Sequence, residues 1–343
     1  MNRKAFTLVE LLAVIVILAV ILAVAIPRIS SIIESAERSS FISSTKLLIK
    51  AVQTKLLEDN NFDITTINKS NMKSLLRIPD DNYSYVSFSY DTGGKIKIDL
   101  QGSDKWKNFV SCGNYDSITL VDCIIKDGLI LNLDAGNSES YVLNSTEWND
   151  LSDSDIVGSL MNGVGYDSGN GGSLTFDGVD DFIDLGTNLG EYSDNISYSF
   201  WANPNSNQIQ YADIFGNHSA NYTGVAFQQN TPNSNIYYFY FGTGISTWKT
   251  SAGVTMVPNV WQHIVVVKST NKVEIYKDGV KKVDSALSGS IAAAPYNFFI
   301  ADGHRPTSRH WKGSLSLFRI YNRVLSESEI TQNFNALKSR YGV

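Results

Sequence analysis

Two stretches in the C-terminal half gather residue types that could bind a ligand. Residues 302–311 combine an acid, two arginines, two histidines and a tryptophan, and residues 216–222 add an amide, a histidine and a tyrosine. Sugar sites pair an aromatic face with fixed polar groups, and pockets in general set a few polar groups on an apolar wall. The candidate ligand-binding residues are therefore Asn217, His218, Tyr222, Asp302, His304, Arg305, Arg309 and Trp311. In the alternative interpretation Trp311 begins a core strand, and the two arginines are simply solvated.

The acids of this half do not suggest a catalytic pair. Glycoside hydrolysis needs two facing carboxylates. The glutamates available are Glu139, Glu147, Glu191, Glu274, Glu327 and Glu329. Lys272 and Tyr276 fill the same-face positions on either side of Glu274, and the sequence contains no Gly-rich phosphate loop and no nucleophile elbow. We therefore expect no enzyme activity.

The N-terminus places one acid inside an apolar segment. Two basic residues precede Ala5, and the 21-residue run from Phe6 to Ile26 contains Glu10. About 20 apolar residues span a bilayer as a helix, and the basic flank stays in the cytoplasm. A carboxylate in such a helix needs a partner. Cleavage between Ala5 and Phe6 would provide one, because the new amino group on one subunit can neutralise Glu10 on the next. The alternative is a secretory signal that is cut near residue 24.

The apolar pattern stays helical beyond the membrane segment. Apolar residues recur at spacings of three and four from Ile29 to Leu56, which is typical of one helical face. Pro27 removes one helix hydrogen bond and is expected to bend the helix. Residues 6–58 are thus predicted to form one helix of about 80 Å, since each residue adds about 1.5 Å.

Residues 59–126 predict a small antiparallel sheet that packs on this helix. A short helical segment is expected near 68–77, and strands are expected at 83–90, 95–100, 108–112 and 118–125, with a hairpin turn at 91–94. Cys112 and Cys123 are the only cysteines. In an exported protein a close pair favours a disulfide; two unpaired buried thiols are the alternative.

Residues 127–343 predict a separate all-β domain, because short strands alternate with turns rich in Gly, Asn, Asp and Ser. Strands are expected at 173–176, 182–185, 196–202, 225–228, 236–241, 261–268, 272–277, 298–301 and 314–321. In the strand expected at 236–241, the alternation puts Tyr237, Phe239 and Phe241 on one face. The other face is then open to a groove or to solvent. Ser326 and Glu329 form a capping box, which predicts a short C-terminal helix that packs Ile330, Phe334 and Leu337 on the sandwich.

The segment Lys4-Ala-Phe-Thr-Leu-Val-Glu-Leu-Leu12 resembles the class III leader of type IV pilins and type II secretion pseudopilins. The resemblance implies that a prepilin peptidase removes residues 1–5 and methylates Phe6, and that Phe6, Glu10 and Pro27 serve filament assembly. Ala5 stands where Gly is commoner in the family. The implied subunit spans the membrane once through 6–26 before it is extracted into an extracellular pilus.

Three further stretches, Gly172–Gly186, Trp261–Gly279 and Gly313–Ile330, resemble the laminin-G-like, concanavalin A-like jelly-roll family. The resemblance spans 127–343. Together the two resemblances imply an α+β pilin, with a long helix on a small antiparallel sheet, followed by an all-β jelly-roll sandwich.

The second resemblance also implies a calcium ion at the rim of the sandwich, and calcium prefers oxygen ligands. Asp213 and Asp302 lie near predicted strand ends and are candidate ligands. Asp177, Asp180, Asp181 and Asp184 form a second cluster. Asp177-Gly178 reads as a turn, in which acids cap backbone amides, and we favour that interpretation there.

The sequence therefore predicts a minor type IV pilin whose lectin-like module acts at the pilus tip and binds glycans or a host or extracellular-matrix protein. The alternative is a minor pilin or pseudopilin that initiates assembly, with the jelly roll contacting other subunits. Residues 1–127 hold 15 basic and 14 acidic residues, whereas residues 128–343 hold 13 and 20. Phosphate backbones attract clustered Lys and Arg, so this acidic module disfavours nucleic acid as the partner.

Overall fold

A computed structural model describes residue 33 and residues 36–343, except 92, 107–108, 119, 121–122, 153, 190–193 and 304–308. The chain divides into two compact units between Cys123 and Ile124, three residues before the predicted start of the second domain. Ala5, Phe6, Glu10 and Pro27 lie outside the described residues. So does the predicted membrane segment 6–26. No helix within the described part is both long and apolar enough to cross a membrane.

The first unit is built on a helix whose described part includes residues 36–58. Phe41, Leu48, Ile49 and Val52 point inward and are fully buried, because their spacings of seven, one and three keep them on one helical face. A short helix, α2 (Lys69–Leu76), follows the 3-10 turn η1 (Ile64–Thr66) and begins at a capping box with Asn68 as the N-cap. The long helix and α2 lie where the sequence predicts helix, whereas η1 was not predicted.

A three-stranded antiparallel sheet completes this unit, in the order β1 (Tyr83–Tyr90), β2 (Ile96–Gly102) and β3 (Val110–Asn114). The 3-10 turn η2 (Asp104–Trp106) lies between β2 and β3. A disulfide joins Cys112 to Cys123. The fourth predicted strand, 118–125, is wrong, because none of its described residues lies in a strand. Leu120 and Cys123 are both buried, and two positions three residues apart cannot share one face of a regular strand.

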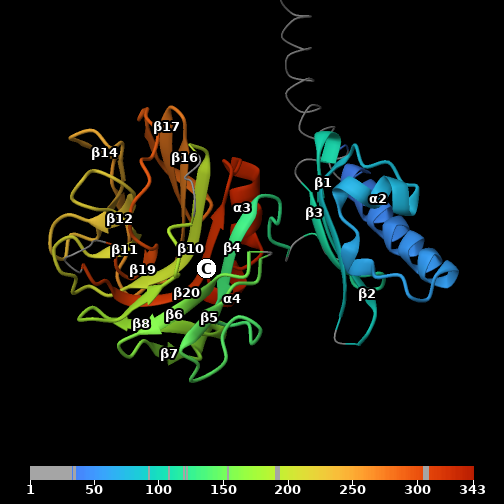
Figure 1. Cartoon of the computed structure of the whole chain (residues 1–343), viewed down its shortest axis with the longest axis horizontal. Helices are drawn as coiled ribbons and strands as arrows, with labels where there is room; N and C mark the ends of the chain where they lie inside the picture. Colours follow the sequence, from blue (N-terminus) through green and yellow to red (C-terminus); the bar gives the residue numbers. More distant parts are fainter. Residues whose placement is uncertain are drawn as a thin grey trace, which may run out of the picture. The chain divides into compact units, whose positions relative to one another are not determined.

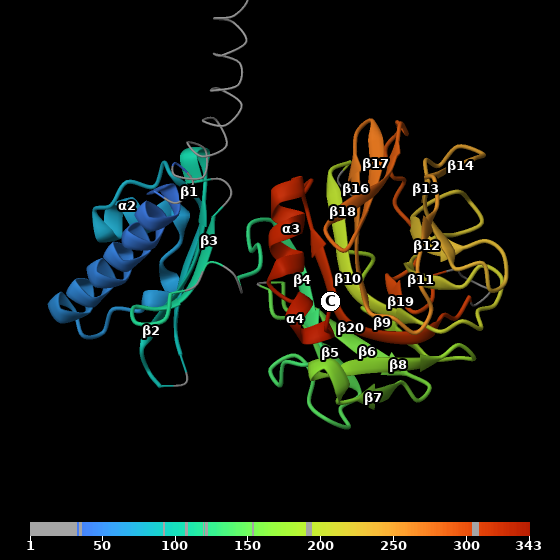
Figure 2. The same cartoon turned by 180° about the vertical axis from the view of Figure 1, so that it is seen from behind.

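The second unit consists of two antiparallel sheets (Figures 1 and 2). In the first sheet the strands run β18-β17-β16-β10-β20-β8-β7, and β4 also pairs with β20. Its strands are β4 (Leu129–Asp134), β7 (Gly165–Asp167), β8 (Ser173–Asp177), β10 (Ile196–Pro204), β16 (Gln262–Ser269), β17 (Lys272–Lys277), β18 (Val280–Ser285) and β20 (Lys312–Tyr321). The 3-10 turn η3 (Gly169–Gly171) connects β7 and β8.

The second sheet runs β14-β13-β12-β11-β19-β9-β6-β5, and β15 also pairs with β13. Its strands are β5 (Glu147–Asn149), β6 (Val157–Met161), β9 (Phe182–Asp184), β11 (Asp213–Gly216), β12 (Val225–Gln229), β13 (Ile236–Gly242), β14 (Trp248–Thr250), β15 (Val254–Thr255) and β19 (Phe299–Ile300). A helix-bearing small sheet followed by two large antiparallel sheets confirms the predicted fold class.

Aromatic side chains from both sheets fill the space between them. Phe200 of β10 packs against Phe215 of β11 and Phe227 of β12 at ring-centroid distances of 5.8 and 5.6 Å. Each of these rings is fully buried, and burying such a side chain contributes about 1.5–3 kcal/mol relative to leaving it exposed. The inner faces are therefore firmly held together, and the outer face of the second sheet rests on a rigid platform.

The C-terminal segment covers part of the outer face of the first sheet. Helix α3 (Glu327–Asn335) begins at the predicted capping box of Ser326 and Glu329, and α4 (Lys338–Tyr341) follows it. Trp201 stacks on Tyr341 at 3.9 Å and lies 5.8 Å from Phe334. This small second core confirms the predicted packing of the C-terminal helix.

Candidate ligand-binding site

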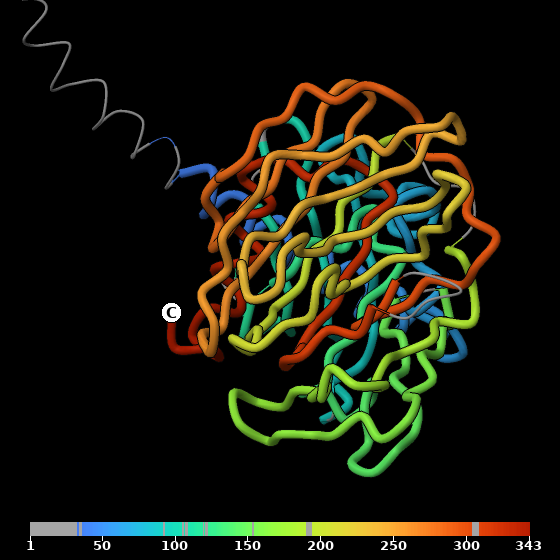
Figure 3. The backbone as a smooth tube through the Cα atoms, turned by 90° about the vertical axis from the view of Figure 1, so that its left-hand side faces the viewer, coloured from blue at the N-terminus to red at the C-terminus, as the bar shows by residue number. Residues whose placement is uncertain are grey.

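A pocket of about 660 Å³ opens over strands β11–β14 of the second sheet. Figure 3 looks onto this sheet, where the yellow-to-orange strands β12, β13 and β14 lie side by side. The aromatic lining residues are Tyr211, Tyr222, Tyr240 and Trp248. The others are Gln210, His218, Ser219, Ala220, Ala226, Gln228, Asn230, Thr231 and Arg309. Aromatic walls with a few polar groups are the usual composition of a small-ligand site.

Strand alternation explains how the floor of the pocket forms. Tyr237, Phe239 and Phe241 of β13 point into the core and are fully buried, so Tyr240 points outward. Ala226 of β12 pairs directly with Tyr240. The small alanine leaves space beside the tyrosine ring, and the pocket occupies it.

Arg309 is fixed on one side of the pocket by its side chain. Its Nη1 donates to Nε2 of His218 at 3.0 Å and to Oε1 of Gln228 at 2.9 Å. The guanidinium carbon lies 4.8 Å from the centre of the Tyr211 ring, a distance at which a cation is attracted to an aromatic face. The charged group is therefore held by three neutral neighbours.

The aromatic residues of the pocket support one another. Trp248 lies edge-on to His218 at 5.6 Å and 5.9 Å from Tyr222. The hydroxyl of Tyr240 donates to Oδ1 of Asn230 at 2.7 Å. Burial raises the pKa of Tyr240, so the phenol stays protonated at neutral pH. These contacts organise the apolar wall before any ligand arrives.

Two acids are buried next to the pocket. Asp213 and Asp302 have no exposed surface. Oδ1 of Asp302 accepts the backbone amides of Gly303 and Arg309 at 2.7 and 2.9 Å, and the amide of Asp213 donates to the carbonyl of Arg309 at 2.9 Å. Both acids are thus tied to the backbone that carries Arg309.

The side chain of Asp213 is the less satisfied of the two. Neither of its carboxylate oxygens has a hydrogen-bond partner in the described part of the chain. Burial raises the pKa of this carboxyl well above its usual range; Arg309 opposes the rise and Asp302 adds to it. Its Oδ2 lies 4.0 Å from Nε2 of His218. A buried carboxylate is costly unless a cation accompanies it, and Asp213 and Asp302 remain the candidate ligands of the calcium ion that the sequence resemblance implies.

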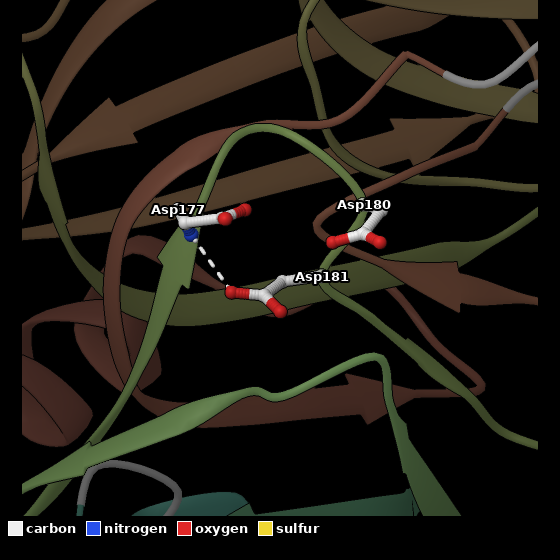
Figure 4. Close-up of side chains that lie close together, drawn as sticks. All are labelled: Asp177, Asp180 and Asp181. Atoms are coloured by element: carbon white, nitrogen blue, oxygen red, sulfur yellow. Dashed lines mark hydrogen bonds between the residues drawn. The ribbon is translucent and has the colours of Figure 1, made fainter.

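A second acidic group, Asp177, Asp180 and Asp181, could also hold a metal ion, because one oxygen from each lies within 4.8 Å of the others (Figure 4). Two of these acids, Asp177 and Asp181, also serve the turn that the sequence predicts. Oδ1 of Asp177 accepts the amide of Val179 at 2.7 Å, and Oδ2 of Asp181 accepts the amide of Asp177 at 2.9 Å. Asp184 is engaged separately by the amide of Gly186.

The structure brings together part of the predicted ligand set. His218, Tyr222 and Arg309 line the pocket. Asp302 is not a lining residue; it is buried and accepts the backbone amide of Arg309. Asn217 is buried and its Oδ1 accepts the amide of Val225, so it holds a turn. His304 and Arg305 lie outside the described residues.

Trp311 follows the alternative interpretation and lies in the core. It is fully buried, and its Nε1 donates to the hydroxyl of Tyr237 at 3.0 Å. Its backbone amide bonds to the carbonyl of Ala301 at 3.0 Å, which shows that the loop has already rejoined the sheet. The ligand-facing part of this stretch therefore ends before Trp311.

The pocket also contains four residues that were not predicted from the sequence, Tyr211, Gln228, Tyr240 and Trp248. Tyr240 could have been predicted from the sequence. Tyr237, Phe239 and Phe241 face the core, so the alternate residues of the same strand face outward. Gln228 follows the same rule on β12, where Phe227 is the core residue. Tyr211 and Trp248 have no such pattern around them.

Two family models match the sequence. Residues 1–26 match the prokaryotic N-terminal methylation motif, and residues 177–331 match the concanavalin A-like lectin/glucanases superfamily. These matches confirm both resemblances. No curated protein matches the chain.

Solved structures of similar fold include domain 4 of AbnA, an extracellular arabinanase from Geobacillus stearothermophilus, in complex with arabinotriose. It is 18% identical, with a TM-score of 0.47 over 60% of this chain and 97% of that one. The binding domain of Paraclostridial Mosquitocidal Protein 1 is 19% identical, with a TM-score of 0.48 over 62% of this chain and 52% of that one. The receptor-binding domain of a botulinum neurotoxin C/D mosaic is 15% identical, with a TM-score of 0.48 over 61% and 51%.

Proposed function

We propose that this chain, which joins an N-terminal methylation motif to a concanavalin A-like domain, is a minor type IV pilin that mediates adhesion. Its jelly-roll unit binds a glycan, or a glycan-bearing host or matrix protein, in the pocket over β11–β14. The observation that carries this proposal is the pocket itself. Four aromatic residues and a fixed set of amide, imidazole and guanidinium groups line one cavity of about 660 Å³. This composition is usual for a small-ligand site and supports recognition of a sugar.

The methylation motif supplies the assembly half of the proposal. A class III leader implies processing by prepilin peptidase and assembly with other pilins. In the proposed sequence of events the chain is cut after Ala5, Phe6 is methylated, and the subunit waits in the membrane through 6–26. The Phe6 amine and Glu10 then pair between neighbouring subunits during extraction, because a carboxylate in the membrane needs a partner. The mature subunit is displayed on the cell surface.

The size of the second unit favours a position at the pilus tip. Residues 124–343 form a compact unit with its own core, larger than the described part of the first unit. A module of this size would crowd its neighbours along a packed shaft, and a tip position avoids that crowding.

The proposed role requires binding without catalysis. Calcium held by Asp213 and Asp302 would neutralise the buried carboxylates and fix the backbone that presents Arg309. Among the described residues that line the pocket there is no carboxylate, so these residues offer no acid/base pair of the kind that glycoside hydrolysis uses. We propose a binding module that is not an enzyme.

Deletion of residues 127–343 in the producing cell tests this function. The truncated chain keeps the first unit, including the Cys112–Cys123 disulfide. The proposal expects normal piliation by electron microscopy together with loss of adhesion to glycan-coated surfaces. Loss of piliation itself would instead support the assembly-initiating role, in which the jelly roll contacts other subunits.

A further inference from the structure

The charge of Arg309 stands out within the pocket. It is the only formally charged residue among the lining residues that the structure describes. Its side chain contacts His218, Gln228 and the ring of Tyr211. Within the described residues it forms no ion pair with a carboxylate, although its charge acts on the buried Asp213. A half-buried cation that forms no ion pair with a described carboxylate can accept an anion from a ligand.

The geometry of the guanidinium shows which part of it is available. Nη1 is occupied by His218 and Gln228, and one face of the group lies over Tyr211. No hydrogen bond joins Nε or Nη2 to another described residue. These two nitrogens share one edge of the guanidinium plane, and their parallel N–H groups match the two oxygens of a carboxylate.

The protein positions this edge before a ligand binds. Oδ1 of Asp302 holds the backbone amide of Arg309, and the amide of Asp213 holds its carbonyl. The side chain is then fixed at Nη1 and by its contact with Tyr211. A preorganised donor pair loses less conformational entropy on binding than a free side chain would.

The rest of the pocket indicates a sugar as the carrier of the carboxylate. Trp248, Tyr222 and Tyr240 supply aromatic surface, and Gln210 and Asn230 supply amides for hydroxyl groups. We infer that the pocket selects glycans that carry a carboxylated sugar, and that the Nε–Nη2 edge of Arg309 binds the carboxylate. This inference rests on the proposed glycan-binding function and specifies its ligand class.

The second unit has a negative net charge, so the preference for a carboxylated sugar must come from direct contact with Arg309 rather than from long-range attraction. Residues 128–343 hold 13 basic and 20 acidic residues, so long-range attraction of an acidic glycan is not expected. At physiological ionic strength charges are screened beyond about 8 Å. Contact with Arg309 therefore decides the preference, and the preference should persist at moderate salt.

The test compares matched glycans on the full-length protein in detergent micelles. One pair is an oligosaccharide with a terminal sialic acid and its desialylated form. A second pair ends in glucuronic acid or in glucose, and carboxyl-reduced forms of both acidic glycans complete the set. A charge-assisted bidentate contact predicts at least about a tenfold preference for the acidic member of a pair. The two pairs show which kind of acidic sugar is preferred.

Variants then assign the preference to one side chain. Arg309→Gln is expected to abolish the preference, and Arg309→Lys to lose most of it, because lysine has a point charge without the planar fork. Lys249→Gln removes the same charge from β14 at a residue outside the pocket lining, and it should leave the preference intact. The carboxyl-reduced glycans keep the test decisive if an arginine variant fails to fold.

Equal binding of acidic and neutral members would overturn this inference while leaving glycan binding in place. Full retention of the preference in Arg309→Gln would overturn it as well. Binding to none of the glycans would contradict the glycan-binding function itself, which is a distinguishable result.

Discussion

The backbone amide of Arg309 donates to Oδ1 of Asp302 at 2.9 Å. This hydrogen bond connects the buried acid pair to the residue that presents the only described charge of the pocket lining. Asp213 adds a second connection through its own amide. A cation that fixes the two carboxylates therefore also fixes Arg309, so metal binding and ligand binding are expected to be coupled.

Calcium should raise the melting temperature of the full-length protein in detergent. The expected cause is preferential binding to the folded state. Asp213→Asn should abolish this rise, because it removes one ligand. In the absence of metal the same change should raise the melting temperature slightly, since it removes a carboxyl group whose ionisation is opposed by burial, with little change in side-chain volume.

The matched control for this experiment is Asp180→Asn. Asp180 is exposed and belongs to the second acidic group. If the calcium response disappears in Asp180→Asn and survives in Asp213→Asn, the metal binds at the turn, and the coupling to Arg309 is refuted.

Trp248→Ala should weaken glycan binding by about tenfold or more, equivalent to about 1.4 kcal/mol, because large aromatic side chains dominate binding energies. The control is Tyr238→Ala, on the adjacent strand β13. Tyr238 shares the outward face with Tyr240 but does not line the pocket. Isothermal titration with a bound glycan measures both. Equal losses in the two variants would argue against the pocket as the binding site.

His263 should make the stability of the second unit depend on pH. It is fully buried, bonds to Ser199 through Nε2 and stacks on Trp201. Burial, and secondarily the nearby Arg319, lowers the pKa of His263 to about 3. Above the unfolded-state pKa of about 6.5 the histidine is neutral in both states. As the pH falls from there towards 3, the unfolded state binds one more proton, so stability is lost at up to about 1.4 kcal/mol per pH unit.

The measurement is chemical denaturation of the wild type and of His263→Gln between pH 7 and pH 4. The glutamine variant can still bond to Ser199, and its stability should fall less steeply with acidification. An identical slope in both proteins would show that His263 does not bind a proton on unfolding.

Removal of the disulfide should destabilise the first unit alone. The double change Cys112→Ala and Cys123→Ala frees a short loop in the unfolded state, and loss of such a cross-link costs about 2–4 kcal/mol. Hydrogen exchange should accelerate in β1, β2 and β3 and stay unchanged in β10 and β16, because the units have separate cores. Uniform acceleration in both units would contradict their independence.

Mass spectrometry of protein from assembled pili should find N-methylated Phe6 at the mature N-terminus. Glu10→Val should leave processing intact and reduce incorporation into the filament, because the membrane partner of the new amine is lost. A mature N-terminus near residue 24 would identify a secretory signal and remove the filament assignment.

Local patterns were enough to predict much of the fold. The alternation of Tyr237, Phe239 and Phe241 gave β13 and its inner face, and the capping box of Ser326 and Glu329 gave the start of α3. Both are encoded within a few neighbouring residues. The strand predicted at 118–125 failed because the disulfide and the buried Leu120 impose a spacing that strand alternation cannot satisfy.

The pocket could be predicted only in part, because the sheet assembles it from distant segments. β11 lies between β12 and β19, so the sheet brings Arg309, which follows β19, next to Tyr211 and Gln228. β14 contains three residues, too few to show an alternation that would mark Trp248. The composition of two loops was enough to predict His218, Tyr222 and Arg309. The residues that complete the pocket come from other segments, and strand order alone brings them next to these three.

The most direct test of the account is binding of the full-length protein in detergent to an array of glycans and matrix proteins, with calcium and then with chelator, alongside Trp248→Ala. The account predicts specific glycan binding that weakens on chelation and that falls by about tenfold or more in the variant. Absence of specific binding in both conditions would contradict the adhesin and support a structural subunit.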